Sequence, residues 1–264
     1  MRKQSTGEPY ALIAPVRFGG RGGESHSYPY PILFIVFTHY AWIVIEYFLE
    51  FPVVAKTMVE PVDFACVQLT QVHGNKVLLV DKTTPSFLEG DAMITQELNL
   101  PLLIKHADCQ VAIVYDPIHH ALGIAHAGWR GQTLSIYTSM INAMKKAFKS
   151  DPKTLHVAFS PSLGPTKSEF KNYQSELPEW MWNYQQAPFH FNLWDIAKAE
   201  FVTCGLLEPK IQLPTLCTYL DSRFHSYRRT KTAQRNHTYG ILSSSKLKLK
   251  GEKCSFSTDG KVSQ

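Results

Sequence analysis

The sequence lacks the short motifs that would assign it to several common classes of protein. Its cysteines are odd in number and widely spaced, at positions 66, 109, 204, 217 and 254, with no Cys-x-x-Cys pair. This spacing argues against a disulfide framework and favours reduced thiols in a cytoplasmic protein. The Gly-rich stretch 17–29 lacks the GxxxxGKS/T and strand-GxGxxG-helix patterns, so it is only a weak indication of phosphate binding.

An uninterrupted membrane-spanning run is also absent. Residues 31–55 are strongly apolar, but His39, Glu46 and Glu50 interrupt them and no basic cluster follows. We therefore expect a buried strand and helix pair here, and no membrane span. The first residues, MRKQSTGEPY, are followed by polar and Gly-rich sequence in place of an apolar h-region, so a cleaved signal peptide is not expected.

Excess charge is concentrated at the C-terminal end. The chain carries 27 lysines and arginines and 22 acids, which gives a net charge of +5. Five lysines but only two acids fall in the Ser/Lys-rich segment 243–264, which we expect to be a disordered tail. The rest of the chain is nearly neutral, so the charge does not require a basic face for nucleic acid, and no such partner is expected.

Short apolar segments separated by turn residues predict a core of β-strands. Two helices are predicted among them: one from about Gln132, with an apolar stripe at three- and four-residue steps, and one from Asn192 to Cys204, ending at Gly205. The order of these segments mixes strands and helices without a regular βαβ alternation. The strand segments lie at 64–69, 76–80, 101–105, 111–115, 121–125, 155–159 and 211–216.

Reactive side chains gather in three segments that adjoin predicted strands, namely QVHG at 71–74, HADC at 106–109 and AHAGWRG at 125–131. Because strand ends often present functional groups, we expect one sheet edge to bring His73, Cys109 and His126 together. Two imidazoles and a thiolate suit zinc and leave a fourth position open for water or substrate. Such a site lowers the pKa of water to about 7, which suits hydrolysis or deamination. Taken singly, each residue is more often structural.

With the later segment CTYLDSRFHSYRR, these motifs resemble the YfiH or laccase-domain family, also called the polyphenol oxidase or purine nucleoside phosphorylase YfiH family. The resemblance covers residues 68–242, roughly two thirds of the chain. It implies a single-domain, mixed-sheet α/β sandwich over residues 1–242, whose N-terminal part to about residue 63 is atypical. It also implies a zinc enzyme that takes purine nucleosides and phosphate as substrates. The reactions implied are phosphorolysis of adenosine, inosine and methylthioadenosine, and adenosine deamination.

The resemblance places the metal ligands at His73, Cys109 and His126. Phosphorolysis also needs cationic groups for phosphate, and a guanidinium offers bidentate contacts. Arg130 is a candidate both for this role and for catalysis. The other candidates for binding phosphate or substrate are Arg17, Arg228, Arg229 and Arg235.

Two acids are further candidates for catalysis. Asp108 is expected to orient a ligand histidine or to act as a base, with a cap at the strand end as the plain alternative. Glu169 is expected to carry a proton, with an ordinary surface position as its alternative. For Arg229 the alternative to phosphate binding is a solvated surface pair.

The sequence departs from the family pattern in places. The segment YPYPILFIVFTHYAW at 28–42 replaces an Asn-Leu-Gly segment that helps to form the pocket, which affects nucleoside binding more than metal binding. Gln110, Ser160 and Gln234 stand where the family has a proline or a glycine. The turns at these positions are therefore expected to differ from those of the family.

Three alternatives to a zinc nucleoside enzyme remain at this point. Copper suits the same ligands, but a copper polyphenol oxidase is the least favoured function because no His-x-His pair occurs in the sequence. Cys109 with a neighbouring histidine would instead serve a cysteine-dependent amidase or hydrolase. A metal-stabilised binding module without catalysis is the third alternative. The sequence does not indicate the oligomeric state.

Overall fold

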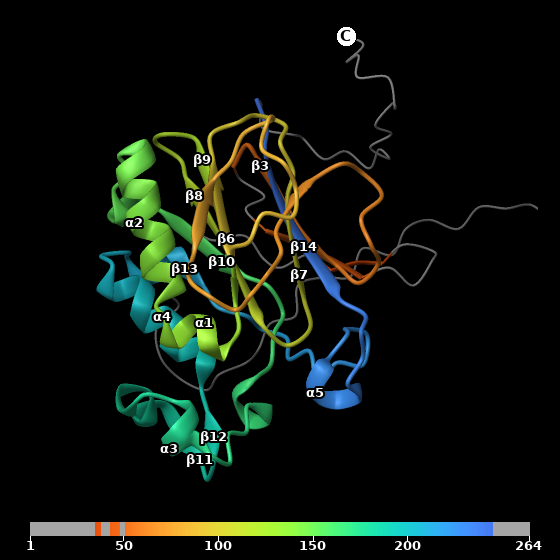
Figure 1. The fold of residues 1–264 in the computed structure, drawn as a ribbon, viewed down its shortest axis with the longest axis vertical. Coiled ribbons are helices and arrows are strands. Elements are labelled where there is room, and N and C mark those ends of the chain that lie inside the picture. The colour runs from red at the N-terminus through yellow and green to blue at the C-terminus, as the bar shows by residue number, and fades with distance from the viewer. Residues whose placement is uncertain (1–34, 38–42, 48–50, 245–264) are drawn as a thin grey trace, which may run out of the picture. The chain divides into compact units, whose positions relative to one another are not determined.

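A computed structural model of the chain describes residues 35–37, 43–47 and 51–244, and Figure 1 shows their helices and strands. Some predictions fall outside these residues. They are the Gly-rich stretch with Arg17, the segment 243–264 beyond residue 244, and much of the apolar run 31–55. The extent of the domain over residues 1–242 and the disorder of the tail therefore stay predictions.

Two six-stranded sheets contain most of the described strands. Neighbouring strands are antiparallel except β4–β7, β5–β6 and β10–β13, so both sheets are mixed. The first sheet has the order β1 (Ile35–Phe37), β2 (Ile43–Tyr47), β3 (Val53–Met58), β14 (Asn236–Leu242), β7 (Leu102–His106) and β4 (Val67–Gln68). The second has the order β13 (Ile211–Gln212), β10 (His156–Phe159), β8 (Gln110–Asp116), β9 (Ala121–Ala127), β6 (Ala92–Thr95) and β5 (Val77–Leu79).

Smaller elements complete the described chain. A separate two-stranded sheet joins β11 (Gln185–Ala187) to β12 (His190–Phe191). The α-helices are α1 (Trp129–Thr133), α2 (Ile136–Phe148), α3 (Tyr173–Glu176), α4 (Leu193–Thr203) and α5 (Tyr227–Thr230). Short 3₁₀ turns lie at Pro152–Thr154, Pro165–Lys167, Glu179–Tyr184 and Glu208–Lys210.

Alternation along the central strands builds one core on each face of the second sheet. In β8, Ile113 and Tyr115 belong to a core shared with β7 of the first sheet. The intervening Ala112 and Val114 face the other way and pack with α2 and α4. Because side chains of a strand alternate between faces, β8 is buried on both sides and reads as a continuous apolar run. The result is three layers: a sheet, a second sheet, and helices.

The two long helices confirm the sequence prediction. The buried residues of α2 follow the predicted apolar stripe and include Met140 and Met144. Asn192 caps α4, because its side-chain oxygen accepts hydrogen bonds from the backbone N–H groups of Trp194 and Asp195. Gly205 follows the helix with a φ of 98°, in the left-handed region where glycine is unstrained.

The described parts of the apolar run 31–55 do not include the helix that we expected there. These parts are strands, since β1 and β2 pair antiparallel and β2 pairs with β3, where Val44 lies opposite Met58. The helix predicted here is therefore wrong for the described residues. β-branched and aromatic residues together make up most of this run, and they favour a pleated surface over a helix. In the described part of the chain, no helix has both the length and the apolar character needed to span a bilayer.

Candidate metal centre

Three separate segments place the predicted ligands at one end of the second sheet. His73 lies in the loop between β4 and β5, Cys109 ends the turn between β7 and β8, and His126 lies in β9. Val111 of β8 pairs with His126, so the register of β8 and β9 brings His126 close to the start of β8, where Cys109 lies. The sheet thus unites residues that are 36 and 17 positions apart in sequence.

The ligand atoms of His73, Cys109 and His126 all lie within 4.8 Å of one another. Cys109 Sγ is 4.0 Å from His73 Nε2, and the two imidazole rings meet edge to face with centroids 4.8 Å apart. His126 is buried, Cys109 is half-buried and His73 is exposed, so the cluster opens to solvent on one side. Among the described residues, this is the one group of three such side chains close enough to hold a metal ion.

The buried carboxylate of Asp91, which was not among the site residues predicted from the sequence, accepts hydrogen bonds from two of the ligand residues. Asp91 Oδ1 accepts a hydrogen bond from His126 Nδ1 at 2.9 Å and from the His73 backbone N–H at 2.9 Å. Asp91 belongs to the segment GDAMIT, in which a charged residue directly precedes an apolar strand. A charged residue directly before an apolar strand is the pattern by which Asp91 could have been recognised, because a charge that becomes buried needs hydrogen-bonding partners.

The protonation of the cluster follows from its mutual contacts. Burial acts to raise the pKa of Cys109, but the charge and hydrogen bonds of His126 and His73 outweigh it and lower the pKa to about 6. Burial acts to lower the pKa of His126, but Cys109 and Asp91 raise it to about 9. The metal-free site therefore favours a thiolate beside an imidazolium, and a thiolate is the form that binds metal.

The residues present fit a metal ion of the zinc type. The donor set combines two imidazoles with a thiolate, and Asp91 occupies Nδ1 of His126, which leaves Nε2 as its metal-binding nitrogen. Gly128 keeps space open beside the cluster. A Cβ at this position would lie 2.8 Å from His73 Cδ2 and 3.2 Å from Cys109 Sγ. Copper suits the same donors.

Asp108 joins Thr218 to the start of α5 beside the cluster. Asp108 Oδ1 accepts a hydrogen bond from the Thr218 hydroxyl at 2.7 Å, and its Oδ2 accepts one from the Arg228 backbone N–H at 2.6 Å. The hydrogen bond to a ligand histidine that we expected of Asp108 is made by Asp91 instead. The Arg228 guanidinium donates to the backbone carbonyl of Glu169, which brings both predicted residues to this side of the molecule.

The remaining arginines differ in what their guanidinium groups contact. Arg130, next to the cluster on α1, is exposed and lies over the Trp129 ring at 4.2 Å. Arg229 donates to the main-chain carbonyls of four residues between 218 and 224, so its guanidinium braces that loop. Arg235 donates to the carbonyls of Thr232 and Gln234. Their roles in phosphate binding stay predictions.

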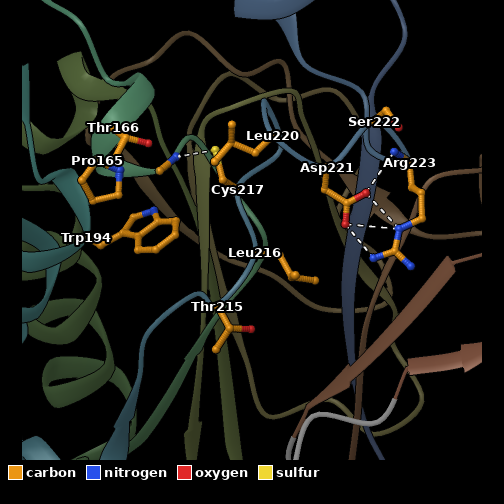
Figure 2. A pocket seen from close by; sticks show the side chains of 11 residues that line it. Pro165, Thr166, Trp194, Thr215, Leu216, Cys217, Leu220, Asp221, Ser222 and Arg223 are labelled. Carbon is orange, nitrogen blue, oxygen red and sulfur yellow. Dashed lines mark hydrogen bonds and ion pairs between the residues drawn. The ribbon is translucent and has the colours of Figure 1, made fainter. Parts of the chain in front are cut away.

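A pocket of about 690 Å³ lies apart from the predicted ligands. Figure 2 shows Trp194, Leu216 and Cys217 around it, with the ion pair between Asp221 and Arg223 on one side. None of the predicted metal ligands or phosphate-binding arginines lines it. We therefore place the candidate chemistry at the His/Cys/His cluster, where the donor atoms converge.

The part of the chain that contains the cluster is similar to known proteins. Residues 53–242 match the model of a family described as multi-copper polyphenol oxidoreductase laccase. Among solved structures, YlmD from Geobacillus stearothermophilus is similar, with a TM-score of 0.69 and 19% sequence identity, over 80% of this chain and 99% of that one. This likeness confirms the mixed α/β fold.

Curated relatives of this chain carry the name purine nucleoside phosphorylase. The protein from Bacteroides thetaiotaomicron is 28% identical over 149 residues, which is 53% of this chain and 55% of that protein. The protein from Staphylococcus aureus strain COL is 35% identical over 120 residues, 41% of this chain and 44% of that protein. The chain thus spans about half the length of the curated relatives it matches.

Proposed function

We propose that this chain, which belongs to the family described as multi-copper polyphenol oxidoreductase laccase, is a zinc-dependent purine nucleoside phosphorylase. The observation that carries this proposal is the convergence of His73, Cys109 and His126 within 4.8 Å at a solvent-accessible edge. The names of the curated relatives support the substrate class, a purine nucleoside with inorganic phosphate. The one cluster of three ligand residues in the described chain favours a single ion over the several coppers of a laccase.

In phosphorolysis, a phosphate oxygen forms a bond to C1′ of the ribose while the bond from C1′ to the purine breaks. The purine leaves with the bonding electron pair and needs a proton, for which Asp108 and Glu169 are our candidates. Arg130 and Arg228 are the proposed phosphate ligands. Arg130 lies next to the cluster on α1, and the backbone N–H of Arg228 donates to Asp108, the residue before Cys109. Arg17 and Arg235 are further candidates. The role of Arg229 is secondary, since its guanidinium braces the 218–224 loop.

His73, Cys109 and His126 would hold the zinc ion through two nitrogens and a sulfur. Zinc bound there supplies a Lewis acid that polarises oxygen ligands and acidifies water near neutral pH. The same property supports adenosine deamination as a second reaction of the site. Adenosine, inosine and methylthioadenosine are the proposed nucleosides, and the cytoplasm is the proposed location, in keeping with the four free thiols of the described chain.

The test combines metal content with product analysis on the same samples. Purified wild type and Cys109→Ser are analysed by mass spectrometry for metal, then incubated with adenosine or inosine, with and without phosphate. We expect about one zinc per chain and free base formed only with phosphate in the wild type, both lost in the variant. Metal without turnover of any nucleoside would contradict the enzyme and favour a metal-stabilised binding module.

The low pKa of Cys109 favours one second candidate, a cysteine-dependent hydrolase. A thiol with a pKa of about 6 beside His126 is an activated nucleophile at neutral pH. Chelation separates the two candidates. Zinc catalysis is lost on chelation and returns with added zinc, whereas thiol catalysis survives chelation. Alkylation of Cys109 should abolish both, because Cys109 is a proposed zinc ligand in one candidate and the nucleophile in the other.

A further inference from the structure

We propose that Asp91 is the positioning residue of the metal centre, joining the loop of His73 to the ring of His126 and keeping His126 Nε2 available to the ion. This inference rests on the proposed metal-dependent function and names a residue that acts through the ligands without contacting the metal or the substrate. It concerns two of the three ligands at once. Cys109 lies outside it, because the turn between β7 and β8 positions that residue.

The Asp91 carboxylate is fully buried at the start of β6 and accepts four hydrogen bonds. Oδ1 accepts from His126 Nδ1 and from the His73 backbone N–H, each at 2.9 Å. Oδ2 accepts from the backbone N–H groups of Gly74 at 2.8 Å and Val72 at 3.2 Å. Three consecutive amides of the loop therefore converge on one anion, as they do in backbone nests.

This arrangement explains the conformation of the His73 loop. His73 has a φ of 61°, which a residue other than glycine adopts only when its surroundings impose it. The carboxylate supplies that constraint, because turning the loop away would leave a buried charge without its donors. The backbone of Asp91 contributes too, since its carbonyl accepts the His126 N–H at 2.7 Å.

The same carboxylate decides which nitrogen of His126 carries a proton. An ionised carboxylate only accepts hydrogen bonds, so Nδ1 must donate and the lone pair of a neutral ring must lie on Nε2. A ligand histidine held in this way has a fixed tautomer and orientation, and loss of such a partner typically weakens metal binding by roughly 10- to 100-fold.

The chain provides a matched control at the opposite end of the second sheet. Asp116 is also fully buried, accepts a hydrogen bond from His119 Nδ1 at 2.9 Å, and accepts two backbone N–H groups, those of Ile118 and His119. Asp116 is absent from the candidate metal cluster. Replacing each aspartate by asparagine therefore removes the same buried charge and one of the two acceptor oxygens beside a histidine, but only Asp91 lies at the metal centre.

The experiment compares full-length wild type, Asp91→Asn and Asp116→Asn. Zinc affinity is measured by chelator competition, and two-dimensional proton–nitrogen NMR identifies the protonated nitrogen of His126. We expect a zinc affinity roughly 10- to 100-fold weaker in Asp91→Asn, together with loss of the protected, downfield Nδ1 proton of His126. Asp116→Asn should keep the wild-type affinity and the His126 signal. A purely structural Asp91 would leave the Nδ1 proton in place.

Two results would overturn the proposal: wild-type zinc affinity in Asp91→Asn, or an equal loss of affinity in both variants. The wild type alone gives a further test if Asp91→Asn does not fold, because metal binding through Nδ1 of His126 would also overturn it. A wild type that takes up no zinc would contradict the proposed function. The protected Nδ1 proton of the metal-free wild type would then still decide whether Asp91 holds His126.

Discussion

Two buried aspartate–histidine pairs lie at opposite ends of the second sheet and have different surroundings. Asp91 and Asp116 each accept one imidazole N–H and backbone amides, and these hydrogen bonds keep the pKa of each carboxyl below its ordinary value although burial acts to raise it. The side chain of His126 is 3% exposed, whereas that of His119 is 34% exposed. Only His126 lies beside a thiol and a second imidazole.

The comparison shows that the carboxylate–histidine pair is not itself a functional site. Local sequence makes the Asp116 pair, because Asp116 and His119 are three residues apart in one turn. The Asp91 pair joins two strands and a loop, so its histidine arrives in a cluster assembled from distant segments. Chemistry at the site therefore depends on what tertiary structure adds to a common local contact.

The largest effect on zinc binding is expected when the histidine of each aspartate–histidine pair is replaced in turn. His126→Ala should weaken zinc binding by more than the roughly 100-fold that loss of a supporting partner costs at most, because it removes a ligand itself. His119→Ala should leave zinc binding unchanged. Chelator competition on both variants measures the difference. Equal zinc affinities for the two variants would show that His126 is not a ligand.

A smaller effect is expected from Gly128→Ala, which changes no hydrogen-bonding group. The added Cβ would lie 2.8 Å from the His73 ring, so the ligands must shift at a cost of about 1–3 kcal/mol. Zinc affinity should fall by roughly 10- to 100-fold. Gly123→Ala in β9, the strand that ends just before Gly128, is the control, because its Cβ would crowd the sulfurs of Met140 and Met144 instead. It should lower stability but not zinc affinity.

A third carboxylate, that of the half-buried Glu200, extends the comparison because it accepts fewer hydrogen bonds than Asp91 or Asp116. Its Oε1 accepts the Thr138 N–H at 2.7 Å, but its buried Oε2 has no partner, and burial raises its pKa from 4.5 to about 7. The folded protein therefore binds this proton more tightly than the unfolded chain does. This contribution to stability is complete below pH 4.5 and is lost as the pH rises to about 7.

Glu200→Gln should flatten that part of the pH dependence. The change in unfolding free energy between pH 4.5 and 7 should differ between wild type and variant by on the order of 2 kcal/mol. Urea unfolding across this range measures it, and zinc affinity serves as the control, which should not change. Parallel stability curves for wild type and variant would contradict the assignment.

The smallest effect is expected at the surface. Asp221 accepts hydrogen bonds from the partly exposed Arg223 beside the pocket in Figure 2, and such pairs contribute about 0–1 kcal/mol. Arg223→Ala should therefore change thermal stability little and leave zinc affinity intact. A fall in zinc affinity would instead show that the pocket and the metal centre are linked.

Local patterns predicted much of the fold. The apolar stripe of α2, the cap of α4 and the central strands follow from residue spacing within one segment, which the sequence displays directly. The helix expected within 31–55 was wrong because a short apolar run does not reveal its period. Its strands are decided by pairing, with β3 lying against β14, where Thr57 and Thr238 share a hydrogen bond.

The metal ligands of the candidate site could be predicted from the sequence, but the residues that hold those ligands in place could not. His73, Cys109 and His126 stand in distinctive short motifs at strand ends, and the structure brings them together as expected. Asp91 contacts residues 17 to 35 positions away, through a register that no local pattern encodes. The contact of Asp108 with Arg228 spans 120 positions and was equally hidden.

By itself, the sequence determined which donor atoms are available and the strands and helices that carry them, because side-chain chemistry and periodicity are properties of neighbouring residues. Only the tertiary structure decided which buried charge holds which ligand, which guanidinium is committed to backbone carbonyls, and which aspartate–histidine pair lies beside a thiol. These depend on strand register and on contacts across the chain, where a shift of one residue turns every side chain to the opposite face.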